Sequence, residues 1–98
     1  MQVCSLVRLD YLNLSDNAIT SIPPEVKQLV ELKLAHFSKN EIKTIPAELS
    51  QLVNLVKLKL AFNSISSFEH VSISTLTNLV TLRLDRNELK TLYNSDTT

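Results

Sequence analysis

The chain has 98 residues, of which 44 % are hydrophobic, and its 10 Lys and Arg balance its 10 Asp and Glu. This length suits a single domain near the lower limit for a useful core, and the composition excludes intrinsic disorder. Zero formal net charge argues against general nucleic-acid binding, and the complete lack of glycine excludes phosphate loops of the P-loop or dinucleotide type.

The first eight residues contain the only cysteine of the chain and no targeting signal. Cys4 has no second cysteine with which to form an internal disulfide, which favours a reducing location. Residues 1–8 are too short and too interrupted by polar groups for a signal peptide. No apolar run approaches the roughly 20 residues of a membrane span. We therefore expect a cytoplasmic protein without a membrane segment.

An asparagine recurs along the chain at a spacing of 23, 23 and 24 residues. The four positions are Asn17, Asn40, Asn63 and Asn87. Leucines precede each of them at fixed offsets, and such a period is typical of a solenoid built from stacked units. The frame predicts one domain over 1–98 with these divisions: a partial unit 1–8, units 9–31, 32–54 and 55–78, and an incomplete last unit 79–98.

The spacing within a unit predicts a short inward-facing strand followed by a turn. In the first unit Leu12 and Leu14 alternate, so both side chains point to one face of a strand. Asn17 follows, and its side chain has both a donor and an acceptor for backbone groups of the turn, which have no strand partner. Stacked units are therefore expected to form a ladder of buried asparagines.

The second half of each unit returns the chain on the outside of the solenoid. Residues 22–29 read Ile-Pro-Pro-Glu-Val-Lys-Gln-Leu, where the prolines and the early glutamate suit one short helical or 3₁₀ turn. Residues 69–78 of the third unit have one extra residue and no proline. We expect a looser and less helical return there.

The second unit departs from the leucine pattern. The 23-residue frame places Ala35 and Phe37 at the two inward strand positions. A slipped frame would instead turn Leu32 and Leu34 inward. The unslipped frame keeps Asn40 and Ile42 at their repeat positions, and a small residue beside a large one conserves core volume. We therefore prefer the unslipped frame.

The units resemble the leucine-rich repeat pattern, L-x-x-L-x-L-x-x-N-x-L, through nearly the whole chain. The return segments 22–29 and 45–52 are similar to the intracellular 23-residue repeats of Ras-suppressor and Ras-group scaffold proteins. This resemblance implies an α/β solenoid, a right-handed horseshoe fragment with a parallel concave sheet of four strands. It also implies a cytoplasmic scaffold that binds a signalling protein, such as a small GTPase or a phosphatase subunit.

Two alternatives to a private scaffold function remain. In the first alternative, the chain is a non-catalytic fragment of a larger leucine-rich repeat receptor, kinase or phosphatase-regulating protein. In the second, it associates with itself through uncapped ends. The frame leaves Val3 and Leu6 at one end, and Leu82 and Leu84 at the other, without a polar capping unit.

The residues that usually carry chemistry are kept apart by the repeat frame. Cys4 and His70 fall in outer returns of different units, whereas His36 falls on the strand face. No metal cluster or Cys–His pair forms from them without breaking the repeat. We therefore expect no catalytic activity, no metal and no cofactor.

The outward strand positions are the candidate partner-binding residues. Ser38 and Ala61 occupy such positions, and the candidates themselves are Tyr11, Asn13, His36, Lys39, Lys57, Lys59, Phe62, Arg83, Asp85 and Arg86. The cations gather towards the C-terminal half, with only Asp85 to oppose them. One interpretation is that these charges simply solubilise an open sheet. The other is a basic patch with aromatic anchors that binds an acidic protein surface.

Overall fold

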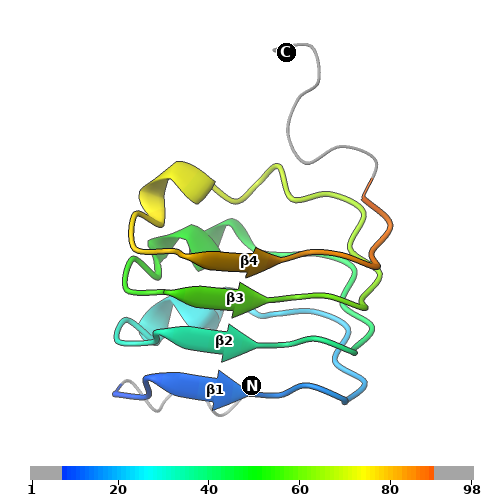
Figure 1. Cartoon of the computed structure of the whole chain (residues 1–98), viewed down its shortest axis with the longest axis horizontal. Coiled ribbons are helices and arrows are strands. Elements are labelled where there is room, and N and C mark those ends of the chain that lie inside the picture. Colours follow the sequence, from blue (N-terminus) through cyan, green and yellow to red (C-terminus); the bar gives the residue numbers. More distant parts are fainter. Residues whose placement is uncertain (1–7, 90–98) are drawn as a thin grey trace.

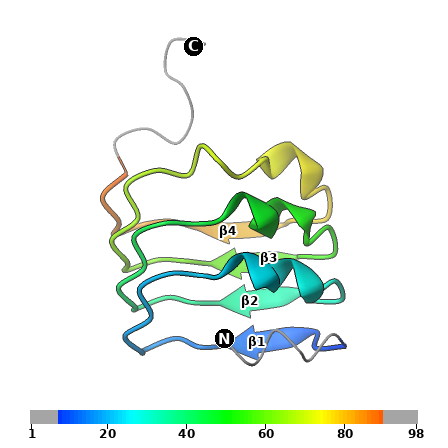
Figure 2. The same ribbon diagram turned by 180° about the vertical axis from the view of Figure 1, so that it is seen from behind.

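The computed structural model describes residues 8–89 as one stack of repeat units (Figure 1). One strand from each unit joins a parallel sheet in chain order: β1 (Tyr11–Asn13), β2 (Leu34–His36), β3 (Lys57–Lys59) and β4 (Thr81–Arg83). The return segments carry 3₁₀ helices on the other side of the stack (Figure 2), namely η2 (Pro24–Gln28), η3 (Ala47–Gln51) and η4 (Ile73–Thr75). The predicted repeat solenoid with four parallel strands is confirmed.

Each strand begins and ends earlier than the leucine spacing indicated. The pattern centred the first strand between Leu12 and Leu14, but β1 ends at Asn13, and the other strands are displaced in the same way. The hydrogen bonding nevertheless continues past the strand end, because Leu14 N–H donates to His36 O at 2.8 Å. Leu14 and its equivalents thus leave the pleat while the chain already turns towards the core.

The core lies between the sheet and the return segments. Most leucines, isoleucines and valines of the two inner units are buried, whereas Val53 and Ile73 are exposed on the return side. In the second unit Ala35 and Phe37 are both 0 % exposed, whereas Leu34 is half-buried on the outward side. The unslipped frame is therefore correct, and Phe37 fills the space that a leucine occupies in neighbouring units.

The return segments follow the proline pattern. η2 and η3 each span five residues, and η2 has proline in its first turn. η4, in the unit without proline, spans only three residues, and its Ile73 is exposed. The looser third return is confirmed.

Every unit places one residue in the left-handed backbone region directly before the repeat asparagine. We call these four residues the left-handed row: Asp16, Lys39, Phe62 and Arg86, with φ of 59°, 61°, 59° and 59°. This conformation costs a residue with a Cβ atom about 1–2 kcal/mol, and glycine, which would avoid the cost, is missing from the chain. The turn is therefore held by interactions outside the row itself.

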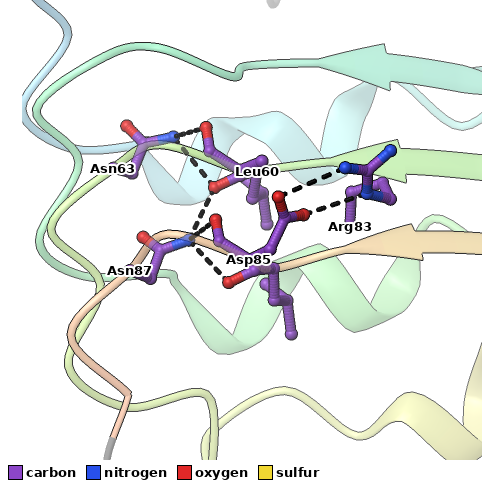
Figure 3. Close-up of polar contacts among 7 residues, drawn as sticks. Leu60, Asn63, Arg83, Asp85 and Asn87 are labelled. Carbon is purple, nitrogen blue, oxygen red and sulfur yellow. Dashed lines mark hydrogen bonds and ion pairs between the residues drawn. The ribbon is translucent and has the colours of Figure 1, made fainter.

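The asparagine side chains supply those interactions. Asn63 Nδ2 donates to Leu60 O and to Phe37 O, both at 3.0 Å, while its Oδ1 accepts from Ile42 N–H at 3.0 Å. Asn40 and Asn87 make the equivalent bonds, and Figure 3 shows how Asn87 also reaches Leu60 O of the preceding unit. Each amide thus joins its own turn to the unit before it, as the ladder predicted.

Burial along the ladder is uneven. Asn40 and Asn63 are buried, but Asn87 is only half-buried and Asn17 is exposed. The expectation that all four asparagines are buried was wrong for Asn17, because no described unit stacks on its outer side. It still donates to Leu14 O at 3.0 Å within its own turn.

A second set of asparagines ties the units together at the other end of the strands. Asn54 Nδ2 donates to Val30 O at 2.8 Å, and Asn78 Nδ2 donates to Val53 O at 3.0 Å. Both residues lie in the turn between a 3₁₀ helix and the next strand. These two asparagines were not predicted from the sequence, because Glu31 occupies the equivalent position in the first unit, although their 24-residue separation matches the repeat.

Replacing Asn63 with alanine is expected to lower the free energy of unfolding by about 1–3 kcal/mol, because the buried Ile42 N–H loses its acceptor. Urea unfolding followed by circular dichroism measures the effect. Asn17→Ala, the same change at the exposed end of the ladder, should cost less, and Ser66→Ala on the surface should cost almost nothing. An Asn63→Ala effect no larger than that of Ser66→Ala would contradict the ladder.

Candidate protein-binding face

The outward side chains of the four strands and the left-handed row together form one surface, which we call the strand face. The strands are in register, so His36 lies between Asn13 and Lys59, and Lys59 lies between His36 and Arg83. Tyr11, Lys57 and Arg83 are exposed, and His36 and Lys59 are half-buried. The structure therefore brings the candidate residues of the sequence analysis onto one face.

Two positions expected on this face are buried instead. Ser38 and Ala61 are 8 % and 5 % exposed. They follow the strand within the turn, where Ala61 O accepts from Lys39 N–H at 2.9 Å and from Asn63 Nδ2 at 3.3 Å. Because these backbone bonds draw the residue inward, only a small side chain fits there in the two inner units.

Arg83 is paired within its own unit. Its Nε and Nη2 donate to the two carboxylate oxygens of Asp85 at 2.9 and 3.2 Å (Figure 3). The bond from Arg83 lowers the pKa of Asp85, and both side chains are exposed. The pair adds little stability at the surface, but it neutralises one of the predicted cations. Lys39, Lys57, Lys59 and Arg86 make no ion pair among the described residues.

His36 has its pKa lowered by partial burial first and by the charge of Lys59 second. Lys39 acts in the same direction, and Asp16 on the neighbouring unit acts against them. Since a free imidazole titrates near 6.5, His36 is mostly neutral at pH 7. It offers the strand face a hydrogen-bonding group rather than another positive charge.

Asn13 is engaged in its own turn. Its Oδ1 accepts from Ser15 N–H at 3.0 Å and from Ser15 Oγ at 2.6 Å. Its Nδ2 lies 3.5 Å from the hydroxyl oxygen of Tyr11, at the limit of a hydrogen bond. The β1 end of the strand face is therefore polar and locally satisfied, with the exposed ring of Tyr11 beside it.

Charge is segregated between the strand face and the remaining surface. The strand-face cations of the second to fourth units face one acid, Asp85, whereas Asp10 and Asp16 lie with the first unit. The turns and return segments among residues 8–89 hold six glutamates, Glu25, Glu31, Glu41, Glu48, Glu69 and Glu88, against three lysines, Lys27, Lys33 and Lys43. The chain as a whole is neutral, yet the strand face from β2 to β4 is basic.

The return side of the stack, within residues 8–89, has no comparable cluster of charged and aromatic side chains. A shallow, mainly apolar depression of about 600 Å³ lies beside the prolines of the first two returns, with His70 at its border. No group of three or more His, Cys, Asp or Glu side chains in residues 8–89 is placed to hold a metal ion. None of the helices in this part of the chain is long and apolar enough to span a membrane. Cys4 lies outside the described residues.

Comparisons with known proteins agree on the repeat. A family model described as leucine rich repeat matches residues 7–65. A leucine-rich repeat protein of Leptospira interrogans superposes with a TM-score of 0.89 and 36 % identity over 94 % of this chain. The internalin inlF of Listeria monocytogenes gives 0.78 and 33 % over 91 %, and internalin C2 of that species gives 0.79 and 26 % over 91 %.

These solved proteins are all much longer than the present chain. It spans 23 % of the Leptospira protein, 26 % of inlF and 38 % of internalin C2. No curated protein sequence matches it.

His36 is expected to titrate below 6.5, and Lys59→Ala should raise its pKa by removing a nearby cation. Because the pKa of His36 is lowered in the folded wild-type chain, the folded chain binds fewer protons at this site than the unfolded chain. The contribution of His36 to stability is therefore lost as the pH falls below about 6.5. NMR of the imidazole signals measures the pKa, and His36→Gln assigns the signal among the two histidines. Lys27→Ala, in η2, should leave it unchanged. A native pKa at or above 6.5 would contradict the lowering of the His36 pKa by partial burial and by the nearby lysines.

Proposed function

Because the chain belongs to the leucine-rich repeat family, whose members are commonly protein-interaction modules, we propose that its strand face binds an acidic surface on a partner protein. The single observation that carries this proposal is the segregation of charge. Lys57 and Lys59 project from the same side of β3, Lys39 and Arg86 lie in the left-handed row, and the glutamates lie elsewhere.

This distribution suits recognition better than solubility alone. Charges that serve only to keep a sheet in solution are satisfied by mixed signs. A face on which one sign predominates, on a neutral molecule, instead orients an approaching acidic partner and raises its association rate. Exposed Tyr11 and Phe62 provide apolar contact area beside the cations, as aromatic side chains do at protein interfaces.

The partner that we propose is a signalling protein. The return segments 22–29 and 45–52 are similar to those of Ras-suppressor and Ras-group scaffolds, which supports a cytoplasmic scaffold or adaptor that binds a signalling protein, such as a small GTPase or a phosphatase subunit. The single cysteine fits a reducing location. The solved neighbours are bacterial, so this assignment rests on the return segments of the chain itself.

The size of the face limits the affinity. Four strands about 4.8 Å apart make a strip only about 14 Å across. Stable interfaces commonly engage about 20–30 residues on each side, more than this strip presents. We therefore expect this stretch of repeats to bind weakly by itself, or to contribute part of a larger binding surface.

Charge reversal tests the proposed face. Lys59→Glu is expected to reduce the capture of acidic proteins from a cell lysate by the immobilised chain, and raising the salt concentration should weaken capture by the wild-type chain. Quantitative mass spectrometry of the bound proteins measures both effects. Lys27→Glu, on the return side, is the matched control. The proposal is wrong if Lys27→Glu abolishes capture while Lys59→Glu retains it.

A second candidate function is self-association through the β4 end of the stack. Leu79, Leu82 and Leu84 are only partly buried, whereas their equivalents in the third unit, Leu55, Leu58 and Leu60, are 0 % exposed. β4 is the last strand of the sheet within residues 8–89, and Val80 just before it is 80 % exposed. Unpaired edges with apolar side chains promote pairing with another chain.

Self-association should appear as a concentration-dependent mass in size-exclusion chromatography with light scattering. Val80→Lys is expected to shift the chain towards monomer, because a charge at the edge opposes pairing. Val30→Lys, at an exposed valine far from β4, should not. A wild-type chain that stays monomeric at all concentrations would exclude this function.

A further inference from the structure

The left-handed row is a preformed line of exposed side chains that crosses all four units. Asp16, Lys39, Phe62 and Arg86 are exposed and hold nearly the same φ. The backbone N–H groups of the first three donate to carbonyls of Ser38, Ala61 and Asp85 in the next unit, at 3.0, 2.9 and 3.0 Å. The row is therefore fixed in register by backbone bonds, independently of the side chains that it displays.

Phe62 is the residue of the row that the backbone explains least. The repeat requires positive φ at this position, which aspartate and asparagine adopt far more readily than a bulky aromatic residue. The side chain of Phe62 is nevertheless 49 % exposed, so burial in the core explains only part of why a phenylalanine occupies this position. Strain at an exposed aromatic side chain is typical of a binding site, and aromatic anchors dominate binding energy.

The order of side chains along the row gives it a direction. From the first unit to the fourth the row is acidic, basic, aromatic and basic. Phe62 thus lies between two cations, one on each neighbouring unit. A complementary partner presents basic, acidic, apolar and acidic groups in that order, at intervals set by the spacing of the strands.

The spacing favours one kind of partner structure. Adjacent units repeat about every 4.8 Å across the sheet. On one face of an α-helix, side chains recur every 3.5 residues, or about 5.3 Å. On one face of an extended strand they recur about every 6.7 Å. Over three intervals, eleven residues of helix drift by about 2 Å from the strand spacing, which long side chains absorb, whereas the extended strand drifts by about 6 Å.

We propose that the left-handed row is a recognition line for an amphipathic helix of the partner, with basic, acidic, apolar and acidic residues at helix positions i, i+4, i+7 and i+11. This inference rests on the proposed binding of an acidic protein surface and adds the secondary structure and register of the partner. The helix runs from Asp16 towards Arg86, because its positive N-terminal end then lies near the acid and its negative C-terminal end near the base. Phe62 contacts the apolar residue, while Lys39 and Arg86 contact the acidic ones.

The test uses synthetic helical peptides as probes. The matched peptide has basic, acidic, apolar and acidic residues at positions i, i+4, i+7 and i+11, with alanine and glutamine elsewhere. The exchanged peptide has the same composition, but its basic residue and its first acidic residue have changed places. Fluorescence anisotropy with the full chain is expected to show about fivefold tighter binding of the matched peptide. An extended peptide with the same groups at alternate positions should bind no better than the exchanged one.

Variants of the row distinguish register from general attraction. Phe62→Ala should remove most of the preference for the matched peptide, whereas Tyr11→Ala, at an equally exposed aromatic residue outside the row, should not. Lys39→Glu should abolish the preference, and exchanging both charges with Asp16→Lys and Lys39→Glu should reverse it in favour of the exchanged peptide, a coupling that a structural effect does not produce. Circular dichroism checks that each variant is folded.

The outcomes separate this inference from the proposed function. Equal binding of the matched and exchanged peptides, lost in Lys59→Glu, would overturn the recognition line while leaving the basic strand face in place. Equal effects of Phe62→Ala and Tyr11→Ala, or tighter binding of the extended peptide, would also overturn it. Failure of every peptide to bind would overturn it as well, and the lysate experiment would then judge the strand face by itself.

Discussion

The structure depends on how backbone groups are satisfied where each strand ends. A parallel strand of three residues leaves N–H and carbonyl groups in the following turn without a strand partner, and burying such groups unpaired is costly. The repeat asparagine resolves this by binding three carbonyls and one N–H across two units. One such amide is needed for every strand, so it sets the period of the sequence.

The same amide allows a strained turn without glycine. A residue with positive φ precedes each asparagine, and the bonds of Asn63 to Leu60 O and Ala61 O fix the turn around Phe62. Since the strain is borne by backbone and amide, the side chain in the row is not needed for folding and is free to vary. The units accordingly place an acid, two bases and an aromatic residue at one backbone position, so the residues that define the fold differ from those of the proposed recognition line.

Sequence periodicity was sufficient for the architecture and insufficient for the details of the surface. The repeat asparagines and leucines placed the strands, the core and even the Ala35 and Phe37 frame, because burial obeys a fixed spacing. Alternation failed beyond the strand end, where Ala61 was expected outward and is buried, since turn bonds rather than pleating decide its direction. The pairing of Arg83 with Asp85 depends on local geometry that no period encodes. The positive φ of the row recurs once per unit, but the four residues differ in type and none is glycine, so their identities gave no signal for it.

The neutral composition of the chain conceals its most informative property. Net charge describes the molecule at a distance, but a partner at a few ångströms meets only one face, because salt screens charges beyond about 8–10 Å. When the charged residues are assigned to the faces of the solenoid, the zero net charge is seen to consist of a basic strand face and an acidic return side. In a solenoid each position of the repeat lies on a known face, so the charge of a face follows from the sequence once the frame is established. Zero net charge, which disfavours general nucleic-acid binding, is therefore compatible with a basic strand face and with the acidic protein partner proposed for it.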